Sequence, residues 1–345
     1  MFNDSEVYQK SLRIFSQNID WNQLKNKTIV IIGASGLIGT YLVDLLMYQN
    51  KMNFLNIKVV AVGRNENNLK RRFCQYLNNV NFKYFIEDIN TGFNYTEQAD
   101  YLLHLASNTH PIAYSQKPIE TLMTNINGSY NLMLWAKEKL NYRFLFLSSV
   151  EIYGQAQNRQ KAFKETDCGF IDCNTVRACY NEGKRAGEAL CQAFIKEHNL
   201  DIVIARLCRV YGPTIKNDDS KALSQFINNG KNKENIVLKS KGEQLFSYLY
   251  VGDVVNAILF LLLNGKIGEA YNVADQNSNI KLKDLAQIIA NIAQTKVVYE
   301  LPDKVEAEGY SKSNMAVLES QKINKLGWQA QYTIVNGITE TMEIG

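Results

Sequence analysis

Short apolar runs alternate along the chain with stretches whose apolar residues recur at helical spacing. The β-branched run Thr28–Ile32 is typical of a buried strand, and a helical pattern over Thr40–Met47 follows it. The same alternation continues to about residue 210. Further strands are expected at 57–62, 82–86, 102–107, 144–147 and 202–205, and a further helix at 180–195. Alternating strands and helices favour an α/β fold: a doubly wound parallel sheet with helices on both faces.

After Pro213 the pattern becomes less regular, which indicates a second, smaller α/β lobe. Residues 268–273 return briefly to the style of the main sheet, and residues 1–26 are polar and helical in part. We therefore predict a helical lead-in over residues 1–26 and a main domain over 27–213 with about 250–276. The C-terminal lobe is predicted over 214–249 and 277–345.

Composition excludes several classes of function. At 345 residues the chain can bury a substantial core, and its net charge of +4 comes from interspersed acidic and basic residues. We therefore expect no nucleic-acid partner.

The longest apolar run, 257–263, is too short to span a bilayer, and no signal-peptide stretch is present, so we expect no membrane association and a cytoplasmic location. Six cysteines form no C-x-x-C pair and only three histidines are present, so no metal site is expected and the thiols are expected to be free.

The turn between the first predicted strand and helix is rich in glycine. It reads Gly33-Ala34-Ser35-Gly36-Leu37-Ile38-Gly39. In such a turn Gly33 permits the tight bend, Gly36 lets the backbone approach a pyrophosphate, and Gly39 lets helix and strand pack closely. The free N–H groups of the helix N-terminus favour an anion. The spacing G-x-x-G-x-x-G differs from the usual G-x-G-x-x-G, and a plain glycine turn is the alternative. The strand–turn–helix context predicts a dinucleotide site in a Rossmann-type domain.

The end of the second predicted strand bears on which dinucleotide binds. An NAD site usually has an acidic residue there, whereas this chain has Arg64. Because Arg64 would attract a 2′-phosphate, NADP is favoured over NAD; a solvated Arg in a basic loop is the alternative. The other predicted cofactor contacts are Asp88 and Ile89, just after the strand at 82–86, and Leu105, Ala106 and Ser107, at the end of the strand at 102–107.

Three residues indicate proton transfer coupled to hydride transfer. Tyr180 and Lys184 are four residues apart in a predicted helix and therefore lie on one face. A phenol with a pKa of about 10 is a poor base near neutral pH, and a neighbouring ammonium is expected to lower that pKa. Ser149 could hold the oxygen that gains or loses the proton. The adjacent Cys179 is expected to be a spectator.

With the glycine turn, Ser149, Tyr180 and Lys184, the chain resembles the extended short-chain dehydrogenase/reductase family over about residues 27–340. Within that family it looks like nucleotide-sugar epimerases, dehydratases and decarboxylases. Three segments are particularly similar to UDP-glucuronate decarboxylases: 105–111, LASNTHP; 124–128, TNING; and 177–185, RACYNEGKR. The resemblance implies NAD or NADP in the first lobe and a nucleotide-diphosphate sugar between the lobes.

The resemblance also implies roles for individual residues. In the family mechanism, a Tyr oxygen takes the proton of the sugar C4 hydroxyl while the C4 hydride goes to the nicotinamide. The 4-keto group then acidifies the C5 proton or lets a C6 carboxylate leave as carbon dioxide. By motif, Tyr180 is the base, Lys184 binds the cofactor ribose beside it, and Ser149 orients the hydroxyl. The implied substrate contacts are Asn108, Thr109, Asn125, Arg177, Arg209 and Tyr248.

Glu151 occupies the place of an extra carboxylate found in dehydratases and decarboxylases of this family. A carboxylate there could move the C5 proton or help with elimination, and a surface Glu on a loop is the alternative. A dehydratase of the dTDP-glucose type usually has an Asp just before this position. Val150 stands there instead, which disfavours that activity.

Two positions depart from the family pattern. The family usually grips the substrate pyrophosphate with an Arg where this chain has Phe246, and an aromatic ring cannot replace a bidentate donor. Arg209 stands where an Asn is common. It could bind the phosphate that Phe246 cannot, and a surface ion pair is the alternative.

Three classes of function stay open. The leading one is transient oxidation at C4 followed by decarboxylation, dehydration or epimerisation. The second is an NADPH-dependent reductase of a nucleotide-linked keto sugar, which Arg64 favours. The third is a non-catalytic, cofactor-sensing binding protein, against which the intact Ser149–Tyr180–Lys184 set argues. The usual setting of this family is the synthesis of surface-polysaccharide precursors.

The resemblance further implies a homodimer. In this family the helices at about 118–139 and 180–197 pair with their mates in a four-helix bundle. Small and apolar residues recur at helical spacing in the second helix and fit this arrangement, although a plain core face would look the same.

Overall fold

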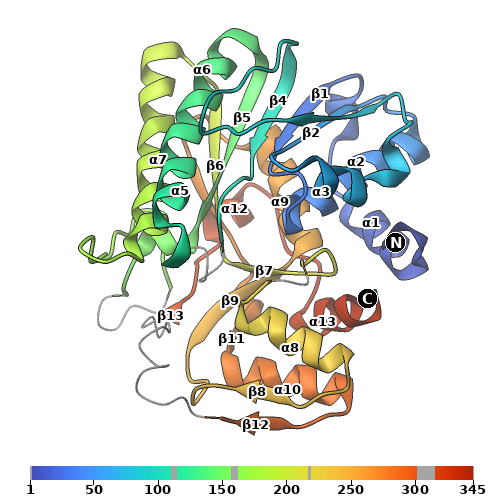
Figure 1. The fold of residues 1–345 in the computed structure, drawn as a ribbon, viewed down its shortest axis with the longest axis vertical. Helices are drawn as coiled ribbons and strands as arrows, with labels where there is room; N and C mark the ends of the chain where they lie inside the picture. Colours follow the sequence, from blue (N-terminus) through green and yellow to red (C-terminus); the bar gives the residue numbers. More distant parts are fainter. Residues whose placement is uncertain (1, 110–114, 157–161, 217–218, 301–314, 345) are drawn as a thin grey trace.

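The centre of the fold is a parallel sheet of seven strands (Figure 1). The computed structural model describes residues 2–109, 115–156, 162–216, 219–300 and 315–344. The strand order β10-β6-β5-β4-β1-β2-β3 places the first strand in the interior, and the chain winds from it toward both edges. This order confirms the predicted Rossmann-type, doubly wound sheet. The strands are β1 Thr28–Ile32, β2 Lys58–Gly63, β3 Phe82–Ile86, β4 Ala99–His104, β5 Leu140–Ser149, β6 Ile202–Leu207 and β10 Ala270–Val273.

Helices cover both faces of this sheet. Ile29 and Ile31 of β1 join one hydrophobic cluster, whereas Val30 and Ile32 join the other. The strand is therefore buried on both sides, as its unbroken apolar run predicts. Helices α6 and α7 cover one face, and α2 and α9 cover the other (Figure 1). The helices around the sheet are α2 Leu37–Asn53, α3 Glu66–Arg72, α5 Pro118–Met123, α6 Ser129–Lys139, α7 Ala178–His198 and α9 Val251–Asn264. Short helical turns are η3 Cys74–Tyr76, η4 Thr124–Gly128, which is π-helical, and η5 Val150–Tyr153.

The N-terminal segment packs against α2 and α9. Its helix α1 Glu6–Phe15 lies between the 3₁₀ turns η1 Phe2–Asp4 and η2 Trp21–Leu24. Tyr8, Leu12 and Phe15 are buried, and the Tyr8 hydroxyl donates to Asp44 on α2 at 2.8 Å. This segment is therefore part of the same hydrophobic core as the main domain.

A second, smaller sheet begins just after β6. Strand β7 Arg209–Tyr211 pairs in parallel with β9 Leu245–Tyr250, so the chain leaves the large sheet at Cys208. Strands β11 Asn279–Lys281 and β13 Met315–Ala316 flank β9, and β8 Ile236–Leu238 pairs with β12 Val297–Tyr299. The remaining helices are α8 Ala222–Lys231, η6 Gln276–Ser278, α10 Leu282–Ala293, α12 Gln321–Lys325 and α13 Ile334–Glu343. Among the described residues, no helix combines the length and the apolar character needed to cross a bilayer.

Helix α7 lies close to β5 because a glycine stands at the contact. A Cβ at Gly187 would lie 2.5 Å from the Phe146 ring and 3.1 Å from the Asn125 carbonyl oxygen. The Phe146 ring is fully buried, so it cannot move aside without disturbing the core. We expect Gly187→Ala to lower the free energy of unfolding by about 1–3 kcal/mol, because overpacking outweighs the gain in helix propensity.

Denaturant unfolding checks this prediction, and Gly183→Ala is its matched control. Gly183 lies in the same helix, but a Cβ there would meet its nearest atoms only at 3.2 Å or more. The control should remain within about 1 kcal/mol of wild type. Equal free energies of unfolding for the two variants would show that the contact with Phe146 does not limit the packing of α7.

Candidate active site

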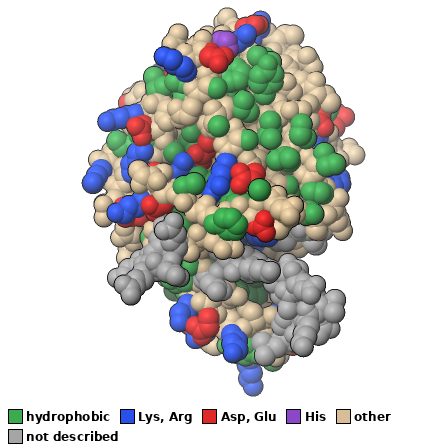
Figure 2. Space-filling view, turned by 90° about the vertical axis from the view of Figure 1, so that its left-hand side faces the viewer, with side chains coloured by type: hydrophobic (Ala, Val, Ile, Leu, Met, Phe, Trp, Pro, Cys, Tyr) green, Lys and Arg blue, Asp and Glu red, His purple; other side chains and the backbone are tan. Residues whose placement is uncertain are grey.

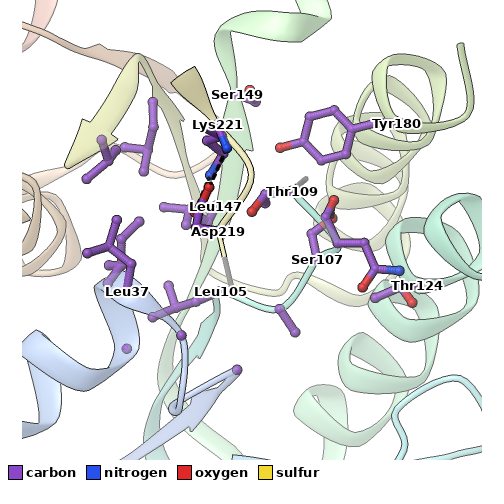
Figure 3. Close-up of a pocket in the computed structure, with 18 of the residues that line it drawn as sticks. Leu37, Leu105, Ser107, Thr109, Thr124, Leu147, Ser149, Tyr180, Asp219 and Lys221 are labelled. Atoms are coloured by element: carbon purple, nitrogen blue, oxygen red, sulfur yellow. Dashed lines mark hydrogen bonds and ion pairs between the residues drawn. The ribbon is translucent and has the colours of Figure 1, made fainter. Parts of the chain in front are cut away.

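A cavity of about 470 Å³ lies beyond the carboxyl ends of the large sheet, between that sheet and the smaller lobe (Figure 3). Its lining comes from the segments that follow β1, β2, β3, β4 and β5, from α7, and from β7, β9 and the start of α8. Ligands of doubly wound sheets bind at this edge, and the volume is that of a small-molecule site. The cavity therefore brings loops of the main domain together with strands of the smaller lobe.

The glycine turn forms one end of this cavity. Gly33 has φ +82°, and a Cβ there would lie 2.9 Å from the Ala106 backbone. A Cβ at Gly39 would lie 2.6 Å from the Gly33 carbonyl oxygen, so neither position has room for a side chain. Gly36 is the N-cap residue of α2 and has no side chain to cap it, which leaves N–H groups of the first turn available to an anion. These residues fit the pyrophosphate of a dinucleotide.

The other predicted cofactor contacts lie around the same cavity. Ile89 is buried, whereas Asp88 is half-buried and accepts a hydrogen bond from the Asn90 N–H at 3.0 Å. The predicted contacts that line the cavity are Ser35, Leu37, Ile38, Arg64, Asp88, Ile89, Leu105, Ala106 and Ser107. The structure thus brings the whole predicted cofactor set to one place.

Arg64 has a partner that sequence reasoning missed. Its half-exposed guanidinium forms an ion pair with Glu120 of α5, and this pairing is the main cause that lowers the pKa of Glu120. The two residues lie 56 positions apart, and no local pattern connects them. The positive charge expected to attract a 2′-phosphate is therefore partly offset.

Tyr180 reaches from α7 toward Ser149 at the end of β5 (Figure 3). Its ring is only 6% exposed, and burial raises the pKa of Tyr180 to about 12. A hydrogen bond with Ser149 acts against this rise in pKa, whereas the Glu151 carboxylate adds to it. The arrangement places a phenol and a hydroxyl side by side at the cavity wall.

Lys184 lies one helical turn further along α7. Its Nζ donates to the Leu147 carbonyl oxygen at 2.7 Å and lies 4.9 Å from the centre of the Phe146 ring. Burial lowers the pKa of Lys184 to about 7. The net pKa of Tyr180 is raised rather than brought toward neutral pH, because burial of the phenol outweighs its hydrogen bond with Ser149. A pKa-lowering effect of Lys184 on Tyr180 stays a prediction. The predicted placement of the pair on one helical face at the cavity is confirmed.

Glu151 lies beside this group, in the turn η5. Its N–H donates to the Ser149 hydroxyl at 3.2 Å, and its carboxylate lies 3.6 Å from the Arg177 guanidinium. Asn181 of α7 donates to the Glu151 carbonyl oxygen at 2.8 Å. Both Glu151 and Arg177 line the cavity. The carboxylate that is predicted to move the C5 proton therefore lies at the cavity wall, paired with the Arg177 guanidinium.

Most of the predicted substrate contacts line the cavity, and one does not. Those on the wall are Asn108, Thr109, Arg177, Arg209 and Tyr248. Asn125 is fully buried behind it, where its Oδ1 accepts from the Ser107 hydroxyl at 3.1 Å and its Nδ2 donates to the Thr121 carbonyl oxygen. The assignment of Asn125 to substrate binding is corrected to support of the Ser107 segment. The last two residues of the motif at 105–111 lie outside the described residues.

Sequence reasoning also missed residues at the start of α8. Lys221 and Asp219 line the cavity, with the Lys221 Nζ 3.4 Å from an Asp219 carboxylate oxygen (Figure 3). Only the irregular pattern after residue 213 marked this region, and it carried no signal for a site. The smaller lobe therefore supplies charged groups that the main-domain motifs do not reveal.

Comparison with known proteins places the chain in a family. The model of the NAD dependent epimerase/dehydratase family matches residues 29–274. The chain belongs to this family. The match spans the large sheet, the glycine turn, Tyr180 and Lys184, so the chain is an NAD(P)-dependent enzyme of the extended short-chain dehydrogenase/reductase type, and the predicted family is confirmed.

Several of the proteins similar to this chain are decarboxylases. UDP-glucuronic acid decarboxylase 4 of Arabidopsis thaliana is 28% identical over 317 residues, which are 91% of this chain and 68% of that protein. The UDP-glucuronic acid 4-epimerase of Bacillus cereus, solved with UDP-glucuronic acid and NAD, has a TM-score of 0.75 at 20% identity. The match covers 92% of this chain and 98% of that one. RMD of Pseudomonas aeruginosa, solved with NADPH, has a TM-score of 0.71 at 21% identity and covers 92% of this chain and 98% of its own. The cofactor of this family member is accordingly NAD or NADP.

The side chains of this cavity suit acid–base chemistry beside a dinucleotide. Within the described residues, no group of three His, Cys, Asp or Glu side chains is arranged to hold a metal ion. All six cysteines are free, and Cys179 has its pKa raised by burial, which suits a packed thiol rather than a nucleophile. Among the ionisable and hydroxyl groups on the cavity wall, Tyr180, Ser149 and Glu151 lie next to one another.

Proposed function

We propose that this enzyme oxidises a nucleotide-diphosphate sugar transiently at C4 and that its net reaction is the decarboxylation of a UDP-uronate. The observation that carries the proposal is the convergence of Tyr180, Ser149 and Glu151 on the cavity that also holds the glycine turn. The similarity to UDP-glucuronic acid decarboxylases over 91% of the chain supports the choice of substrate.

The chain's own residues account for the movement of the first proton. Tyr180 Oη takes the proton of the C4 hydroxyl, and Ser149, which hydrogen-bonds Tyr180, orients that hydroxyl. A dinucleotide held at the glycine turn would supply the acceptor and donor of the C4 hydride, and the positive charge of its oxidised form would favour the phenolate. Lys184 holds its place through the Leu147 carbonyl, at the position from which it can bind the cofactor ribose.

Glu151 and Arg177 account for the next steps. Oxidation at C4 places a ketone β to the C6 carboxylate, and loss of carbon dioxide leaves an enolate that needs a proton at C5. Glu151 is the carboxylate placed to relay this proton from solvent water to C5. A uronate brings a second carboxylate next to Glu151, and the Arg177 guanidinium, 3.6 Å from Glu151, offsets that repulsion. A neutral hexose would not need this cation.

A mass-spectrometric screen of nucleotide sugars tests the proposal. The enzyme is incubated with UDP-glucuronate, UDP-glucose, dTDP-glucose and GDP-mannose, each with NAD⁺ or NADP⁺. Loss of carbon dioxide from UDP-glucuronate with no net change in cofactor is the expected result. Loss of water, or an isomer of unchanged mass, would replace decarboxylation with dehydration or epimerisation. A gain of two hydrogens from reduced cofactor on a keto sugar would identify a reductase, and binding without turnover a non-catalytic protein.

The preference between NAD and NADP depends on Arg64 and its partner. We expect Glu120→Gln to shift the ratio of the two dissociation constants toward NADP⁺ by roughly 5-fold, because it frees the Arg64 charge from a partly exposed ion pair. Fluorescence titration with each dinucleotide measures the ratio. Glu66→Gln is the control, since Glu66 follows Arg64 closely in the sequence but pairs with Lys70. An unchanged ratio in Glu120→Gln would remove Arg64 from cofactor selection.

A homodimer through the α5–α7 side is part of the proposal. Ile119 of α5 is 78% exposed and Tyr130 of α6 is 45% exposed, while Ala189 and Ala193 lie exposed on α7. Figure 2, which faces this side, shows hydrophobic side chains gathered between charged ones. Small residues would let two copies of α7 approach closely, and sedimentation velocity tests this state. A cytoplasmic location is likewise proposed, supported by six free thiols.

A further inference from the structure

Arg209 and Phe246 meet on the wall of the cavity that belongs to the smaller lobe. Arg209 of β7 stands opposite Tyr248 of β9, and Phe246 lies two residues before Tyr248, so all three side chains share one face of the sheet. The Arg209 guanidinium lies over the Phe246 ring at 3.8 Å from its centre, and the ring is only 6% exposed. Stacking of this kind fixes the plane of a guanidinium and leaves its edge free to donate.

The Arg209 charge has no carboxylate partner within the described residues. Three other cations on the cavity wall are already paired: Arg64 with Glu120, Arg177 with Glu151 and Lys221 with Asp219. The Nε of Arg209 is buried and makes no hydrogen bond among the described residues. A buried donor without an acceptor is costly, and an anion in the cavity would satisfy it.

We propose that Arg209 binds the diphosphate of the substrate and that Phe246 is a positioning residue that orients the guanidinium. This inference rests on the proposed nucleotide-diphosphate sugar. The glycine turn, which fits the cofactor pyrophosphate, belongs to the main domain, whereas Arg209 and Phe246 belong to the smaller lobe, so each diphosphate has its own binding group. The Arg209 fork matches two oxygens of a diphosphate in a way that a lysine cannot.

Calorimetric titration of the NAD⁺-saturated enzyme with UDP tests this role. Arg209→Gln should raise the Kd for UDP roughly 10- to 100-fold, because glutamine cannot form the charge-assisted bidentate hydrogen bonds. Arg209→Lys should recover only part of that affinity. Lys266→Gln, which removes one positive charge from an exposed loop away from the cavity, should leave the Kd unchanged.

Substitutions of Phe246 test its positioning role separately, through the Kd for UDP. Phe246→Leu should raise the Kd for UDP roughly 3- to 10-fold, and Phe246→Tyr, which keeps the stacking face, should stay near wild type. In the Arg209→Gln background, Phe246→Leu should add nothing, because its effect acts through the guanidinium. In turnover, both single variants should raise KM and leave kcat within about 2-fold.

The outcomes separate this inference from the proposed function. UDP binding that depends on Arg209, in an enzyme that turns over no UDP-uronate, would keep the inference and overturn the decarboxylase proposal. Turnover of UDP-glucuronate with a wild-type Kd for UDP in Arg209→Gln would overturn the inference alone. Additive effects of the two substitutions would remove the positioning role of Phe246. Absence of UDP binding by the wild-type enzyme would overturn both.

Discussion

Replacement of Tyr180 by phenylalanine is expected to lower kcat roughly 10²- to 10⁴-fold, the usual contribution of a positioned general base. The substitution removes one oxygen from a ring that is 6% exposed, so the packing of α7 is kept. Ser149 retains its place through the Glu151 N–H. The Kd for UDP and for NAD⁺ should therefore change by less than about 3-fold, which assigns the loss to proton transfer and not to binding.

Single-turnover measurement of carbon dioxide release from UDP-glucuronate checks this result. Tyr299→Phe is the control, because it removes the same oxygen from a ring that is 55% exposed on β12. Turnover by Tyr180→Phe at the wild-type rate would show that another group takes the C4 proton. If Tyr180→Phe slows turnover and also raises the Kd for both UDP and NAD⁺, the phenol is a binding group rather than a base.

The pKa of Tyr180 illustrates what a sequence can and cannot predict. The i, i+4 spacing to Lys184 correctly places both residues at the cavity, because helical periodicity is a local property. The sign of the pKa shift depends on burial, which is set by β5, α7 and the loops that close over them. Burial raises the pKa of Tyr180 to about 12 and lowers the pKa of Lys184 to about 7. No pattern within residues 180–184 carries that information.

In the fold and the site alike, local patterns could be predicted from the sequence, whereas contacts between distant segments could not. Apolar runs such as Thr28–Ile32 predict the buried strands, and parallel strands bring the segments that follow them to one edge. The Arg64–Glu120 pair was not foreseen, because its partners come from distant segments whose approach depends on tertiary packing. Asn125 was misplaced for a different reason. It lies in the π-helical turn η4, where Thr124 lines the cavity and Asn125 points into the core, and a motif match gives no side-chain direction.

The stacking of Arg209 on Phe246 explains in structural terms why the chain departs from the family motif at both positions. In the sequence the two residues are two departures from the family pattern, 37 positions apart, and nothing there shows that they are in contact. The parallel pairing of β7 with β9 puts them on one face, where the aromatic ring that cannot bind phosphate supports the guanidinium that can. The pairing of two short strands in the smaller lobe could not be read from their irregular pattern.

Replacement of Glu151 by glutamine is expected to lower the rate of product formation roughly 10²- to 10³-fold, because an amide cannot relay a proton to C5 of the enolate. Gln keeps the size of the side chain and can still accept from the Arg177 guanidinium, so the wall of the cavity should keep its shape. The first oxidation at C4 does not require Glu151. The bound nicotinamide should therefore become reduced in a burst whose near-ultraviolet absorbance persists, in contrast to Tyr180→Phe, which should give no burst.

Stopped-flow absorbance and mass spectrometry of the quenched reaction together decide this point. Glu182→Gln is the control, since Glu182 lies on the same helix as Tyr180 but pairs with Arg185 and does not line the cavity. If Glu151→Gln releases carbon dioxide and forms product at the wild-type rate, Glu151 serves only as a partner for Arg177. If neither oxidation nor decarboxylation proceeds, the carboxylate is needed to place the substrate. Glu151 is assigned to the C5 proton only if its variant still reduces the nicotinamide in a burst but forms no product at the wild-type rate. That result separates oxidation at C4, which does not need Glu151, from the later protonation at C5, which does.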